Sequence, residues 1–131
     1  MILLDTHAWV WWLSNPDKLS VRARKTIDAA SAAGEAHVSA ISCWEVALLV
    51  ERGRLVLTVE LEDWMTRASG LPYFRFVDVD PWIAVRSVRL AEPFHADPAD
   101  RITVATALRM SAKLVTRDRN IRDYPHVKTI W

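Results

Sequence analysis

Three large apolar residues near the start of the chain, Ile2, Leu3 and Leu4, constrain its fold more than any other segment. They do not alternate with polar residues, which is typical of a strand buried on both faces of a parallel sheet. Asp5 follows directly. A carboxylate at this point lies at the carboxyl edge of the sheet, where open α/β folds bind their ligands. The first five residues therefore predict an α/β protein with an acidic group at its ligand-binding edge.

The length and composition of the chain favour a single domain, residues 1–131. With 131 residues, 51% of them hydrophobic, the chain can form one core but not two ordinary domains. The 17 Lys and Arg and the 16 Asp and Glu leave a net charge of +1, so an anionic ligand must be held by local clusters. Cys43 is the only cysteine, which excludes a disulfide framework and a thiolate zinc site and fits a reducing compartment. No segment approaches the roughly 18 to 20 apolar residues of a membrane span, so we expect a cytoplasmic protein without membrane contact.

Strands and helices alternate along the rest of the chain. This order predicts a mainly parallel sheet of four to five strands that is covered by helices on both faces. Pro, Gly, Ser and Asn punctuate the chain at the element boundaries. The expected strands are 2–4, 37–41, 74–79, 113–116 and 127–130. The expected helices are 6–13, 21–33 after a cap at Ser20, 43–52, 61–69, 81–90, and a long helix to 112 that Asp97 or Ala99 could cap, with a helical turn near 120.

Four acids are predicted to meet at the carboxyl edge, because each helix of a parallel α/β sheet begins near the edge from which the preceding strand emerged. Crowded carboxylates repel one another, and a hard cation such as Mg²⁺ or Mn²⁺ resolves the conflict. Such a metal acidifies a bound water and stabilises displacement at phosphorus, so the pattern points to phosphodiester hydrolysis with one ion or two. The four acids are Asp5 after the first strand, Glu45 and Asp100 in the first turns of their helices, and Asp118 beyond the strand that ends near Thr116.

Each acid also has a structural explanation. Acids are favoured in the first turns of helices by the helix dipole. Ser42 and Glu45 match the capping-box pattern, and Asp118 is suited to an N-cap or a turn. Asp5 is the hardest to explain in this way, because the end of a buried strand has no need for a charge.

Other polar residues at the same edge are secondary candidates. Thr6 and Thr116 could orient carboxylates or a metal-bound water, and Asp97 could support Asp100 or simply cap its helix. Arginines suit bidentate phosphate contacts, although a solvated surface position explains any single one equally well. The candidates to bind substrate phosphates are Arg117, Arg119 and Arg122 around Asp118, with Arg52 and Arg54 further from the edge.

Tryptophan is abundant for a chain of this size. Six of the seven residues, Trp9, Trp11, Trp12, Trp44, Trp64 and Trp82, are more than a small core easily buries. Some could line a groove for a partner helix or a dimer contact, and core packing under the sheet is the equal alternative.

Five short motifs follow one another along the chain. They are Leu3–His7 with Trp11 and Trp12, Ser42–Ala47, His95–Arg101, Leu114–Asp118 and the terminal Val127–Trp131. In these motifs the chain resembles the PIN-domain nucleases and, among them, the VapC-type toxins of bacterial toxin–antitoxin pairs. The resemblance implies a three-layer α/β/α sandwich, endoribonuclease activity that depends on Mg²⁺ or Mn²⁺, a homodimer, and a cognate antitoxin that blocks the site. The family's acidic quartet falls on Asp5, Glu45, Asp100 and Asp118, with no acid missing.

Two alternatives to this function stay open. The first is a non-catalytic α/β binding module that uses its acidic edge for a cation or for a basic partner segment. The second is a nuclease that acts on DNA or on flap structures, because no feature of the sequence reads the 2′-hydroxyl of RNA.

Overall fold

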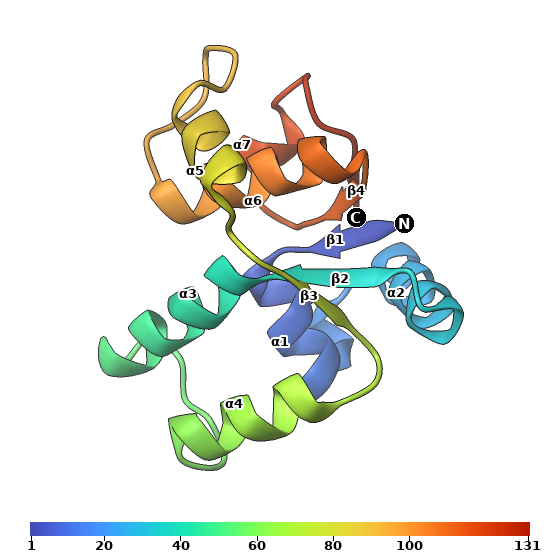
Figure 1. The fold of residues 1–131 in the computed structure, drawn as a ribbon. Helices are drawn as coiled ribbons and strands as arrows, with labels where there is room; N and C mark the ends of the chain where they lie inside the picture. The colour runs from blue at the N-terminus through green and yellow to red at the C-terminus, as the bar shows by residue number, and fades with distance from the viewer.

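Five parallel strands form the central sheet of this computed structural model, which describes all residues from 1 to 131. The strand order is β3-β2-β1-β4-β5, so the apolar N-terminal strand lies in the middle (Figure 1). This confirms the predicted parallel sheet and the burial of the first strand on both faces. The strands are β1 (Ile2–Leu4), β2 (Ala36–Ser39), β3 (Arg75–Val77), β4 (Lys113–Val115) and β5 (Thr129–Ile130).

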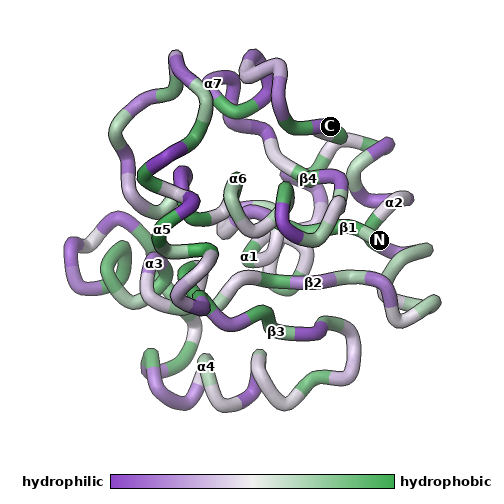
Figure 2. The backbone as a smooth tube through the Cα atoms, turned by 45° about the horizontal axis from the view of Figure 1, so that its top comes forward, coloured by the Kyte–Doolittle hydropathy of each residue, from purple (hydrophilic) through white to green (hydrophobic).

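Helices cover both faces of the sheet and make the three-layer α/β/α arrangement (Figure 1). Side chains on successive β1 residues point to opposite faces, so Leu4 packs in one core with Trp9 and Leu3 packs in the other with Ile83. Figure 2 shows hydrophobic residues along β1 and hydrophilic residues on much of the outer turns. One layer contains α1 (Thr6–Ser14), α2 (Val21–Ala33), α3 (Ala40–Glu51) and α4 (Leu61–Gly70), and the other contains α5 (Pro81–Val88), α6 (Pro98–Met110) and the short α7 (Arg119–Arg122).

The start of α3 differs from the sequence prediction. The strand was expected to continue to Ile41 and Ser42 to cap the helix, but β2 ends at Ser39 and α3 begins at Ala40. The Ser39 hydroxyl accepts a hydrogen bond from Ile41 N at 3.2 Å, so this serine is the N-cap. Glu45 is therefore the sixth residue of α3, beyond its first turn, and the capping-box explanation of Glu45 is wrong.

The other boundaries agree within a few residues. The side chain of Asp97 accepts a hydrogen bond from Asp100 N at 2.9 Å, which makes Asp97 the cap of α6. The third and fifth strands are shorter than expected, and a 3₁₀ turn (Pro16–Lys18) after α1 was not expected. None of the helices combines the length and apolarity that a membrane crossing requires.

One buried and one exposed valine in the α5–α6 layer provide a test of the core packing. Val104 is fully buried in α6, whereas Val88 in α5 is 75% exposed. We expect Val104→Ala to lower the free energy of unfolding by roughly 1 to 3 kcal/mol, because two buried carbons are lost and a cavity is left. The matched change Val88→Ala should leave stability within about 0.5 kcal/mol of the parent. Urea denaturation measures both, and equal losses would contradict the described packing.

Candidate functional site

The strand order places the ligand-binding edge at the carboxyl ends of β1 and β4. The chain runs outward from β1 through β2 to β3 and then returns to the other side of β1, where β4 pairs with it. Open α/β sheets bind ligands where the strand order reverses in this way. Asp5 follows β1 and Thr116 follows β4, so both lie at this point.

Asp5 has a structural role that the sequence reasoning did not find. Its Oδ1 accepts a hydrogen bond from Ala8 N at 2.8 Å, so it is the N-cap of α1. Its Oδ2 accepts a hydrogen bond from the Thr116 hydroxyl, which is fully buried behind it. The same Thr116 oxygen accepts a hydrogen bond from Asp118 N at 3.0 Å. Thr116 therefore joins the loops after β1 and β4 and holds two of the predicted acids beside each other.

Thr6 plays the corresponding role toward α3. Its buried hydroxyl donates a hydrogen bond to Ser42 Oγ at 2.9 Å. Ser42 lies one helical turn before Glu45, so this bond fixes α3 against α1 on the side from which Glu45 projects. Thr6 thus acts by positioning an element of the site.

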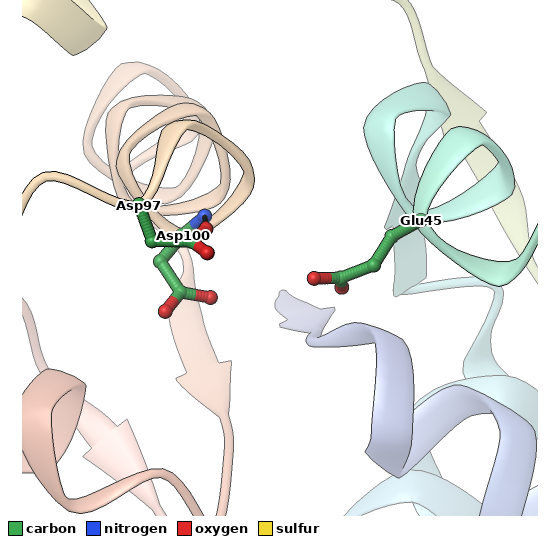
Figure 3. Close-up of side chains that lie close together, drawn as sticks. All are labelled: Glu45, Asp97 and Asp100. Carbon is green, nitrogen blue, oxygen red and sulfur yellow. Dashed lines mark hydrogen bonds between the residues drawn. The ribbon is translucent and has the colours of Figure 1, made fainter. Parts of the chain in front are cut away.

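Glu45 and Asp100 point toward each other from α3 and α6, with Asp97 beside Asp100 (Figure 3). One carboxylate oxygen from each of these three residues lies within 4.8 Å of the others. Asp100 Oδ2 also lies 3.1 Å from His95 Nε2, within ion-pair distance when the imidazole is protonated. This close cluster therefore holds two of the four predicted acids, Glu45 and Asp100, together with Asp97, which was predicted only as a secondary residue.

Burial and neighbouring carboxylates raise the pKa values of Asp100 and Asp5. The pKa of Asp100 rises from 3.8 to about 7, first because burial disfavours its charged form and then because of the nearby carboxylates of Asp97, Asp118, Glu45 and Asp5. Burial also raises the pKa of Asp5, with a contribution from Glu45, while the hydrogen bonds from Thr116 and Ala8 act in the opposite direction. Five carboxylates therefore share one electrostatic environment.

All five acids line one open cleft of about 540 Å³. Arg54 and Arg117 line it too, and neither forms a salt bridge in the structure. Arg119 and Arg122, predicted as phosphate contacts, instead line a separate hollow with Asp123. The remaining lining residues are Thr6, His7, Trp11, Leu49 and Thr103.

Sequence reasoning ranked Arg54 low and did not place His7 or Trp11 at the site. Arg54 reaches the cleft because Gly53, with φ of +67°, turns the chain at the end of α3 and brings Arg54 N within 2.9 Å of Leu49 O. His7 and Trp11 are four residues apart on α1 and share one side of that helix. Because α1 begins directly after Asp5, the four-residue spacing of His7 and Trp11 could have placed both side chains at the acidic edge from the sequence alone.

The chemistry of the donors fits a hard cation. The cluster offers only carboxylate oxygens, which are the preferred ligands of Mg²⁺ and Mn²⁺. The pKa of Asp100 is raised by burial and then by neighbouring carboxylates, and a bound cation would offset the repulsion from those carboxylates.

Similarity to known proteins extends over almost the whole chain. The family model described as PIN domain matches residues 2–127. Ribonuclease VapC22 of Mycobacterium tuberculosis (strain ATCC 25618 / H37Rv) is 36% identical over 132 residues, which cover 99% of this chain and 98% of that protein.

Solved structures match the fold over almost the full length. FitAcB from Neisseria gonorrhoeae superposes with a TM-score of 0.72 at 24% identity, covering 100% of this chain and 97% of that chain. VapBC2 from Rickettsia felis, bound to a DNA fragment from its promoter, gives 0.72 at 14% identity, with 99% and 98% covered. A toxin–antitoxin complex from Klebsiella pneumoniae gives 0.68 at 20% identity, with 100% and 97% covered.

The raised pKa of Asp100 makes stability depend on pH. The folded protein holds this proton up to about pH 7, whereas the unfolded chain releases it near 3.8, so stability falls as the pH rises through that window. We expect Asp100→Asn to raise the free energy of unfolding of the metal-free protein by at least about 1 kcal/mol at about pH 8, and by less at about pH 5. Denaturation in EDTA at both pH values measures the difference. An equal gain at both would show that Asp100 ionises normally.

Proposed function

Because the chain belongs to the PIN-domain family, we propose that it is a metal-dependent endoribonuclease that acts in the cytoplasm as the toxin of a toxin–antitoxin system. The observation that carries the proposal is the single cleft into which five carboxylates and two unpaired arginines project. The 36% identity with a ribonuclease over 99% of the chain supports the choice of RNA as substrate.

We assign the metal to the predicted quartet, Asp5, Glu45, Asp100 and Asp118. When bound there, Mg²⁺ or Mn²⁺ supplies an acidified water and stabilises negative charge at phosphorus. Asp97 is given a positioning role, because it caps α6 and accepts a hydrogen bond from Asp100 N. Thr116 and Thr6 are positioning residues as well, through their bonds to Asp5 and to Ser42.

The arginines of the cleft give it affinity for a polyanion. Carboxylates alone would repel an RNA backbone, since like charges at short range oppose binding. Arg54 and Arg117 are free to pair with phosphate oxygens, because no carboxylate of the protein pairs with either. The chain's own part in the reaction is to hold the phosphates between these cations and the acids.

A homodimer and a cognate antitoxin belong to the same proposal. The solved relatives include a toxin–antitoxin complex, which supports an antitoxin partner. Helix α3 is apolar on almost all sides, yet only Ser42 and Val46 are buried, and Trp44 is 52% exposed. A helix of this kind is normally covered, so we propose its outer side as the contact with a second copy.

Replacing one ligand of the metal tests the nuclease function. We expect Asp5→Asn to reduce RNA cleavage at least about 100-fold, the scale of losing one preorganised electrostatic group. The fold should persist, because asparagine caps a helix as well as aspartate does. Cleavage of a structured RNA is measured with Mn²⁺ or Mg²⁺ and again with EDTA, which should stop it.

The matched control is Asp17→Asn, because the Asp17 side chain is 93% exposed and lies outside the cleft. It should cleave like the parent. Undiminished cleavage by Asp5→Asn would exclude the mechanism. A parent protein that binds metal but cuts neither RNA nor DNA would instead be a binding module.

A charge placed on α3 tests the dimer. Trp44→Glu should convert the dimer to a monomer, because burying an unpaired carboxylate costs several kcal/mol. Val56→Glu is the control, since Val56 is 89% exposed in the segment after α3. Light scattering after size exclusion gives the mass of each. A dimer that survives Trp44→Glu would place the contact elsewhere.

A further inference from the structure

An aromatic group lies in the cleft beside the carboxylates, and the metal chemistry makes no use of it. His7 and Trp11 both line the cleft, and their ring centroids are 5.5 Å apart with the planes tilted by 52°. His7 is exposed, while Trp11 is half-buried, and the ring centroids of Trp11 and Trp131 are 6.1 Å apart. The exposed imidazole therefore lies next to a pair of packed indole rings.

Two cations surround the same indole. Lys18 Nζ lies 5.8 Å and Arg117 Cζ 5.9 Å from the centre of the Trp11 ring. Neither Lys18 nor Arg117 forms a salt bridge with an acid of the protein. Aromatic rings next to unpaired cations are the combination with which proteins hold single-stranded nucleic acid, because the rings stack on bases and the cations track phosphates.

We propose that His7, next to Trp11, is the stacking platform for an unpaired base beside the scissile phosphate. This inference rests on the proposed nuclease function. It adds a specificity-determining part to the cleft, with Arg117, which lines the same cleft, holding the adjoining backbone.

The geometry selects against a duplex. A base inside an RNA helix is stacked on both faces, so its plane cannot lie on a side chain unless it is flipped out. The platform lies in the same cleft as the acids, because Asp5 and His7 are two residues apart at the start of α1. A base stacked on His7 therefore belongs to a nucleotide close to the reacting phosphate.

The test measures binding rather than cleavage. Each variant is made in the Asp100→Asn protein, and the probe is a short single-stranded RNA that contains 2-aminopurine, with its duplex and the matching single-stranded DNA for comparison. Stacking quenches 2-aminopurine fluorescence. We expect quenching with the single strands only, and a roughly tenfold weaker affinity for them in His7→Ala and in Trp11→Leu. Trp11→Phe, which keeps a ring, should restore most of the affinity.

Trp82→Leu is the matched control, because Trp82 has the same local chemistry outside the cleft. Its ring is 48% exposed, with Arg109 Cζ at 4.6 Å and Arg86 Cζ at 5.6 Å from its centre. This variant should bind the single strand like the parent. Equal affinity for single strand and duplex, no loss in His7→Ala, or an equal loss in Trp82→Leu would overturn the proposal.

RNA cleavage by the unsubstituted protein tests the proposed nuclease function separately from the binding assay. Cleavage without selectivity for single strands would refute the platform alone, whereas absence of cleavage would refute the nuclease.

Discussion

Repulsion among carboxylates at one edge of the sheet is the constraint on which the rest of the structure depends. Asp5, Asp97 and Asp118 each cap a helix, with backbone N–H groups of α1, α6 and α7 donating to their oxygens. The positive ends of three helix dipoles therefore offset part of the negative charge. Asp5 and Asp118 both begin a helix and line the cleft as proposed metal ligands, so a structural role of an acid does not exclude a functional one.

Buried hydroxyl groups keep the acids in place. Thr116 connects the ends of β1 and β4 through Asp5 and Asp118 N, and the Thr6–Ser42 bond connects α1 with α3. The Thr6–Ser42 bond is buried, so replacing one partner leaves the other without a hydrogen bond and costs more than the bond itself contributes. Burial and the remaining repulsion among the acids raise the pKa of Asp100.

The cleft carries both negative and positive side chains, and this distribution of charge fits the proposed function. The acidic cluster attracts a cation, while Arg54 and Arg117 attract an anion, and neither arginine is neutralised within the chain. A nucleic acid suits both parts of the cleft, because its phosphates can pair with the arginines while a metal ion occupies the acidic cluster. The aromatic residues of α1 add a surface that phosphates alone would not require.

Local sequence determined most of the fold, because apolar runs, caps and turn residues act within a few positions. Ile2–Leu4 predicted a central strand, and the alternation of elements predicted the parallel sheet that gathers four acids at one edge. Tertiary structure decided what depends on contacts between distant residues. The partners of Thr116 and Ser42, the inclusion of Asp97 and Arg54 in the cleft, and the separation of Arg119 and Arg122 from it all follow from how helices pack on the sheet. The sequence predicted that Ser42 caps α3, but β2 ends at Ser39, and this serine, three residues earlier, is the cap in the folded chain.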